Sequence, residues 1–222
     1  MPKAKIWRRG LAVLAVMVLA LVCASRPVAA HGGRSDAGPV TGIPIPNLTH
    51  GQMAVIADHF GEILDLAAGQ VRKDEPFRRL MNYANIQFSF CLWGLVPGGV
   101  TDEASPFNEC SHAYLAAARA VLTRMLDDPA RTPAVDALVS RVEVEMLMNR
   151  ASLVLCQYSS ETFDTARIIR PDWRGVLGHP PSLAAFAGAG VLAAGGIGAI
   201  LFATSPRRTR RTPDRRNAGA KA

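Results

Sequence analysis

Acidic residues are scarce at both ends of this 222-residue chain, where basic residues gather. No Asp or Glu precedes His31, and Asp214 is the one acid after Ala203. The middle of the chain, 31–183, carries 13 Lys and Arg against 17 Asp and Glu, a formal charge of −4. The overall charge of +7 therefore describes the two ends. A nucleic-acid-binding domain carries positive charge on its folded body, so nucleic acid is not the expected partner.

The chain also lacks the short motifs of several enzyme and cofactor classes. It has no Cys-x-x-Cys pair, no Cys-x-x-Cys-His haem motif, no Gly-x-Ser-x-Gly turn and no phosphate-binding loop. No two histidines are spaced as His-x-x-x-His, which would place both imidazoles on one helix face. The sequence therefore gives no argument for an enzyme, and a binding or structural role is expected.

Two long apolar stretches are present, and the first lies near the N-terminus. Four basic residues precede an apolar run over 11–22, which is too short to cross a bilayer comfortably. Val28-Ala29-Ala30 then offers the small residues of a signal-peptidase site. This arrangement predicts a signal peptide over 1–30 and a mature chain that begins at His31. A cut after Ala24 and an uncleaved anchor are the alternatives.

The second apolar stretch, 183–203, is 21 residues long and uncharged. As a helix it would span about 30 Å, the thickness of a bilayer core. Seven Lys and Arg residues follow in 204–222, and positive charge favours the cytoplasmic side. We therefore expect one transmembrane helix in a bacterial inner membrane, a periplasmic N-terminal domain and a cytoplasmic tail. A buried helix of a soluble protein is the alternative.

Small residues recur at four-residue intervals along this second stretch, as in Gly190, Ala194 and Gly198. Such spacing lets the backbones of two membrane helices approach closely. It predicts packing against another membrane protein or a second copy of this chain. A composition rich in Ala and Gly would explain the same pattern without a partner.

Between the apolar stretches, hydrophobic residues recur at helical spacing in four segments. An irregular segment over 31–48 precedes them, and a linker over 159–182 follows, with a short helix expected near 161–168. Capping residues or prolines mark the helix starts, with a capping box predicted between Thr49 and Gln52. The fourth helix is expected to continue to about Tyr158. The expected starts are Thr49, Glu75, Ser105 and Thr132. Short connections favour antiparallel neighbours, so an all-α, up-down-up-down four-helix bundle is predicted over 49–158.

Three cysteines remain once the signal peptide is removed: Cys91, Cys110 and Cys156. In the predicted bundle they end the second helix, begin the third and end the fourth, so all three lie at one end. An oxidising compartment favours a disulfide between two of them. We expect Cys91–Cys110, with Cys110–Cys156 as the alternative, and one thiol left free.

Two histidines are expected at the same end of the bundle. His50 lies at the start of the first helix, and His112 follows Cys110 by two residues. Thiolate and imidazole together bind zinc or copper. A copper or zinc site formed by His50, Cys110 and His112, with Cys91 or Cys156 as a further ligand, is therefore the alternative to a purely structural disulfide.

Two functions from different classes fit these features. The first is a membrane-anchored periplasmic accessory or protein-interaction module without catalytic activity, which the anchor and its small residues favour. The second is a periplasmic protein that handles copper or zinc, which the cysteines and histidines at one end favour. No cofactor is expected under the first function.

Cleavage of the signal peptide is tested by intact mass and N-terminal sequencing of protein extracted from membranes. We expect the sequence to begin at His31, because the small residues before it suit signal peptidase. A chain that still begins at Met1 would contradict cleavage and support an uncleaved anchor.

Overall fold

The computed structural model describes residues 42–204 and is mostly helical in that range. The predicted signal peptide and basic tail lie outside the described residues. Two short strands and five α-helices are present there, with the 3₁₀ helices η1 (Leu92–Gly94), η2 (Ala151–Leu153) and η3 (Gly175–Gly178) between them. The strands and α-helices are β1 (Pro44–Ile45), α2 (His50–Gly69), α3 (Glu75–Phe90), α4 (Asn108–Asp127), α5 (Pro133–Met148), β2 (Phe163–Asp164) and α6 (Pro180–Thr204).

Helices α2 and α5 form one antiparallel pair. His59 of α2 bonds to Glu145 of α5, with Nε2 and Oε2 3.0 Å apart. One turn later on α2, Glu62 accepts a hydrogen bond from Arg141, which lies one turn earlier on α5. The matched order of these contacts fixes the opposite directions of the two helices.

Helices α3 and α4 form the second antiparallel pair. Asp74, which caps the start of α3, accepts a hydrogen bond from Arg124 near the end of α4. At the opposite end of the pair, Cys91 and Cys110 form a disulfide with their Cα atoms 5.9 Å apart. The structure thus joins the first of the two cysteine pairs expected from the sequence.

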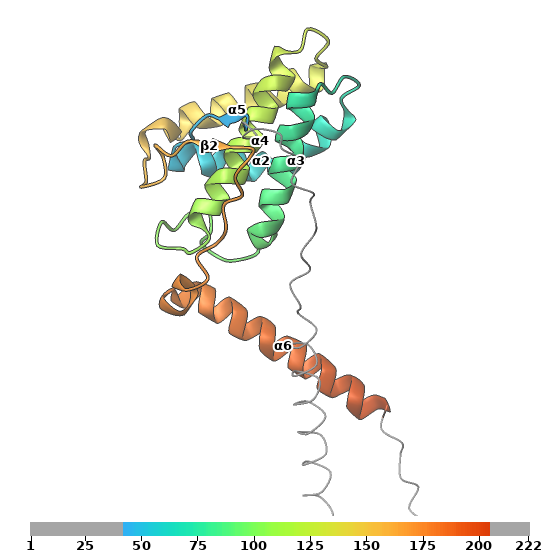
Figure 1. Cartoon of the computed structure of the whole chain (residues 1–222), viewed down its shortest axis with the longest axis vertical. Helices are drawn as coiled ribbons and strands as arrows, with labels where there is room; N and C mark the ends of the chain where they lie inside the picture. Colours follow the sequence, from blue (N-terminus) through green and yellow to red (C-terminus); the bar gives the residue numbers. More distant parts are fainter. Residues whose placement is uncertain (1–41, 205–222) are drawn as a thin grey trace, which may run out of the picture. The chain divides into compact units, whose positions relative to one another are not determined.

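The two pairs cross, as Figure 1 shows. His50 and Phe60 lie almost three turns apart on α2, yet they contact His112 and Tyr114, which lie only two residues apart on α4. Antiparallel pairing is expected of an up-down-up-down bundle, whereas this crossing departs from its nearly parallel axes. The first half of α4 lies at the crossing and is buried, including the run Cys110–Ala118.

The fourth helix is shorter than expected. Helix α5 ends at Met148, and Arg150 then adopts the left-handed conformation with φ of 50°. Glycine or Asn usually occupies such a position, so the sequence carried no stop signal there. Cys156 consequently lies in an irregular segment after η2 rather than at the end of a helix. The third helix also starts later, at Asn108, because Ser105 caps the preceding turn through the amide of Phe107.

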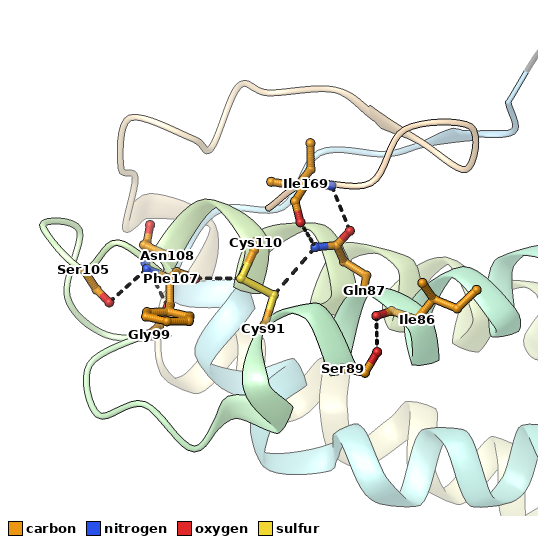
Figure 2. Close-up of a disulfide and its surroundings, with 10 residues drawn as sticks. All are labelled: Ile86, Gln87, Ser89, Cys91, Gly99, Ser105, Phe107, Asn108, Cys110 and Ile169. Atoms are coloured by element: carbon orange, nitrogen blue, oxygen red, sulfur yellow. Dashed lines mark hydrogen bonds between the residues drawn. A yellow bond between two sulfur atoms is a disulfide. The ribbon is translucent and has the colours of Figure 1, made fainter. Parts of the chain in front are cut away.

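The segment after Cys156 packs along the domain and contains no helix at 161–168. Instead β2 pairs with β1 in antiparallel register, with Ile45 opposite Phe163. Buried Gln87 of α3 then bonds to both backbone groups of Ile169, as Figure 2 shows beside the disulfide. The side-chain nitrogen Nε2 of Gln87 also lies 3.7 Å from the Sγ atom of Cys91. Gln87 therefore contacts both the disulfide and the segment around Ile169.

Helix α6 has the length and composition of a membrane span. Its 25 residues carry no charge, and an 18-residue window within it has a mean hydropathy of 2.0, with none of that window buried among the described residues. Such a helix is about 37 Å long, enough to cross a bilayer core. One C-terminal helix could thus cross a membrane, while its packing through Gly190, Ala194 and Gly198 stays a prediction.

Removing the disulfide should destabilise the domain. The bridge spans 19 positions of sequence, and closing a loop of this size contributes about 3 kcal/mol by the chain-entropy estimate. The double variant Cys91→Ser/Cys110→Ser should therefore lower the free energy of unfolding by about that amount in urea titrations of detergent-extracted protein. Cys156→Ser is the control, because it leaves the bridge intact. Equal stability of the double variant and the wild type would contradict the pairing.

Candidate metal-binding site

Three side chains that can ligate a metal meet where the two helix pairs cross. One ligand atom each from His50, His112 and Cys156 lies within 4.8 Å of the other two. The closest pair is His112 Nε2 and Cys156 Sγ, 3.0 Å apart. His112 is fully buried, while His50 and Cys156 are partly buried. The group is therefore nearly enclosed but reachable from one side.

Contacts at the start of α2 determine where Cys156 lies. Thr49 caps α2 in the predicted capping box with Gln52, and its hydroxyl also donates to the carbonyl of Ala151 at 2.7 Å. The amide of Gly51 donates to the carbonyl of Val154 at 3.0 Å. A Cβ at Gly51 would lie 2.5 Å from the carbonyl oxygen of Ala151, so only glycine permits this approach. These contacts hold 151–156 against α2 and place Cys156 beside both histidines.

Ser159 orients the cysteine from the other side. Its hydroxyl accepts a hydrogen bond from the Cys156 amide at 2.8 Å and lies 3.5 Å from the Cys156 sulfur. A donor that contacts the sulfur in this way orients it as a ligand. Cys156 is the one free cysteine among the described residues. The thiol is therefore available for ligation.

Burial keeps the His112 imidazole neutral. Removal from water, with a smaller contribution from neighbouring His50, lowers the pKa of His112 to about 4. A metal binds the neutral form of histidine, so no proton has to leave His112 at neutral pH before a metal binds.

Two ring nitrogens in the site have no hydrogen-bond partner. The Nδ1 atoms of His50 and His112 are both buried and unpaired among the described residues. An unsatisfied buried polar atom costs about 1–3 kcal/mol, so two in one site require an explanation. An ion binds only one nitrogen of each ring. Bound to His50 Nδ1 it would give that atom a partner, whereas His112 faces Cys156 through Nε2, so its Nδ1 would stay unpaired.

The donor set fits a thiophilic metal. Around a tetrahedral zinc ion, neighbouring nitrogen and sulfur ligands lie about 3.3 to 3.7 Å apart, as follows from bond lengths of about 2.0 to 2.3 Å. The ligand atoms here spread to 4.8 Å, so the group must contract by about 1 Å around an ion. His50 and Cys156 are only partly buried, so rotation of their side chains would allow that movement. One thiolate and two imidazoles suit copper and zinc, not calcium or magnesium.

The thiol and imidazole pair also resembles the nucleophile and base of cysteine hydrolases, but its environment differs. Such a base is oriented by a third group on its other nitrogen, and His112 Nδ1 has none among the described residues. The lowered pKa of His112 also disfavours the imidazolium that would stabilise a thiolate. Metal ligation is therefore the better interpretation of this pair.

An acidic cleft lies beside the site. The Tyr158 ring packs 5.9 Å from that of His112 and also lines a cleft of about 190 Å³. Glu103, Glu109 and Asp172 line the same cleft. Burial raises the pKa of Tyr158, and the nearby carboxylates raise it further. Acidic walls raise the local concentration of cations, so the cleft provides a favourable approach for a metal ion.

The structure groups two of the three predicted ligands and replaces the third. His50 and His112 come together as expected, whereas Cys110 forms the disulfide with Cys91 and does not join them. Cys156, expected only as a further ligand, supplies the thiol. The odd number of cysteines predicts one free thiol, and the predicted bundle already places Cys156 at the same end as the two histidines.

Comparisons of the chain with protein-family models, with curated proteins and with solved structures find no match. The case for a function therefore depends on the site itself.

Acid should destabilise the protein through His112. Its pKa is about 4 in the folded chain and 6.5 unperturbed, so between these values the unfolded chain binds a proton that the folded chain does not. Stability is complete above pH 6.5 and falls as the pH drops towards 4, by about 2 kcal/mol at pH 5. Urea unfolding of metal-free protein at pH 7 and pH 5 measures this loss.

His112→Gln is the matched variant, because it keeps a polar side chain without a proton to bind in this range. The variant should lose less stability between pH 7 and pH 5 than the wild type. An identical pH dependence of the two proteins would contradict the buried, neutral state of His112.

Proposed function

We propose that this protein is a membrane-anchored, metal-binding protein whose helical domain holds one copper or zinc ion. His50, His112 and Cys156 are the proposed ligands. The observation that carries the proposal is that these soft donors from three separate segments meet within 4.8 Å, with Nδ1 of His50 buried and unpaired among the described residues.

The coordination number separates the two metals. Three protein ligands complete a trigonal copper(I) site, whereas zinc would keep a fourth position for water or for a group of a partner. The acidic cleft at Tyr158 supports exchange of the ion with the surroundings rather than permanent burial. Handling of a metal, meaning its capture and release, fits this arrangement better than a purely structural role.

The proposed location follows from the ends of the chain. Helix α6 anchors the protein, the signal peptide exports the domain to the periplasm, and the basic tail remains in the cytoplasm. The oxidising periplasm favours the Cys91–Cys110 bridge, which leaves Cys156 as the thiol for the metal.

An accessory role beside another membrane protein is the second candidate. It is supported by the open surface of α6, where a Cβ at Gly190 or Gly198 would meet no atom within 4 Å. Another membrane helix could pack closely along such a surface. The two candidates are compatible, because a metal site near the membrane can serve a partner within it.

Metal content tests the principal proposal. Full-length protein extracted in detergent, stripped with chelator and reloaded with copper(I) or zinc, should retain one ion per chain after gel filtration. Cys156→Ser and His50→Ala should each weaken binding at least about tenfold in a competition titration, because each removes a ligand.

His59→Ala is the control for these variants. His59 lies on the same helix as His50 but pairs with Glu62 and Glu145, outside the site. The His59→Ala variant should bind metal as the wild type does. Wild-type protein that retains neither metal, or Cys156→Ser protein with undiminished affinity for both, would refute the proposal.

A further inference from the structure

Large apolar side chains are exposed on three loops of the domain. Trp93 is 58% exposed in the loop after α3, Leu153 is 75% exposed in the loop after α5, and Leu177 is 78% exposed just before α6. Other exposed apolar residues lie on the same loops: Leu95, Val154, Leu155 and Trp173. Large exposed apolar side chains on neighbouring loops are typical of an interaction site.

The three loops contact one another. The amide of Asp172 donates to the carbonyl of Pro106 at 2.9 Å, which joins the loop before α6 to the one before α4. Gln157 reaches the carbonyl of Glu103 at 3.5 Å, which brings in the loop after α5. The cleft beside Tyr158 is lined by residues of all three loops. We call these loops, 92–107, 149–158 and 171–179, the root surface.

The root surface holds the start of α6. His179 precedes the helix, and its imidazole bonds to Ser182 at 2.7 Å and to Asp102 at 3.0 Å. Phe186, in the second turn of α6, packs against the rings of Phe107 and Trp173. The point where α6 begins is therefore fixed against the exposed apolar loops.

The loops at the other end of the α3 and α4 pair have a different character. In 70–74 and 128–132, Val71 is the one large hydrophobic residue that is exposed. Its neighbours there are charged: Arg72, Lys73, Asp74, Asp128 and Arg131. The exposed apolar loop residues thus gather at the end of the domain that carries α6.

We propose that the root surface docks on the lipid bilayer, so that the domain lies against the membrane instead of standing away from it. This inference depends on α6 spanning the membrane, as the proposed function holds. The first turn of a span lies at the membrane interface, and the contacts of His179 and Phe186 keep the three loops close to that point. Two of the exposed residues are Trp, which favours the interface because its ring is apolar and its N–H is polar.

The bilayer is the occupant that the structure favours over a protein partner. If α6 spans the membrane, its first turn brings lipid close to the loops that contact it in every molecule, without a second component. Leu155 and Cys156 are adjacent, so docking would also bring the metal-binding site to the membrane interface.

Fluorescence of full-length protein in phosphatidylcholine vesicles tests the docking. The three native Trp residues are first replaced, as Trp7→Phe, Trp93→Phe and Trp173→Phe. Leu153→Trp then introduces a single fluorescent residue that is far from α6 in sequence. Val71→Trp in the same background is the matched control, because Val71 is also an exposed loop residue. Vesicles with acyl chains brominated near the headgroup quench a Trp that enters the interface.

Docking predicts that brominated lipid reduces the emission of Leu153→Trp about twofold, since interfacial groups lie about 5–10 Å into the headgroup and acyl boundary. The emission of Val71→Trp should not change. Equal emission of Leu153→Trp in brominated and unbrominated vesicles would overturn the proposal. So would emission that changes only with the ratio of protein to lipid, because that result indicates a second copy of the chain on the surface. Co-flotation with vesicles reports the anchor separately, so failure of α6 to insert is distinguished from failure to dock.

Discussion

The close contact between the start of α2 and the segment after α5 is the constraint on which the site depends. Thr49 and Gly51 bond to this segment, and the lack of a side chain at Gly51 allows the two backbones to touch. Without that contact, Cys156 would lie on a free loop with no fixed relation to His50 or His112. Hydrogen bonds made by Thr49 and Gly51, on either side of His50, thus determine which side chains could share a metal.

The disulfide has a complementary role, because it removes two of the three thiols from competition for a metal. Cys91 and Cys110 close one end of the α3 and α4 pair, and Gln87 connects this end to the segment that leads to α6. The bridge, the site and the base of α6 therefore belong to one connected set of contacts.

Much of this arrangement was predictable from the sequence, and the exceptions have physical causes. Periodicity and capping residues predicted the helices, and the capping box at Thr49 is present as expected. The end of α5 was not predictable, because Arg150 adopts a conformation that usually requires glycine or Asn. The sequence thus predicts Cys156 at the end of a helix, whereas it lies in an irregular segment. The prediction of Cys110 as a metal ligand is the alternative to a purely structural disulfide, and the structure uses Cys110 in the disulfide. The crossing of the helix pairs depends on side-chain packing around α4, which periodicity does not encode.

X-ray absorption spectroscopy of the metal-loaded protein tests the central claim most directly, because it counts the atoms bound to the ion. The account predicts one sulfur neighbour at about 2.3 Å and two imidazole nitrogens at about 2.0 Å, with the sulfur signal lost in Cys156→Ser. A spectrum with only nitrogen and oxygen neighbours, or with two sulfurs, would contradict a site formed by His50, His112 and Cys156.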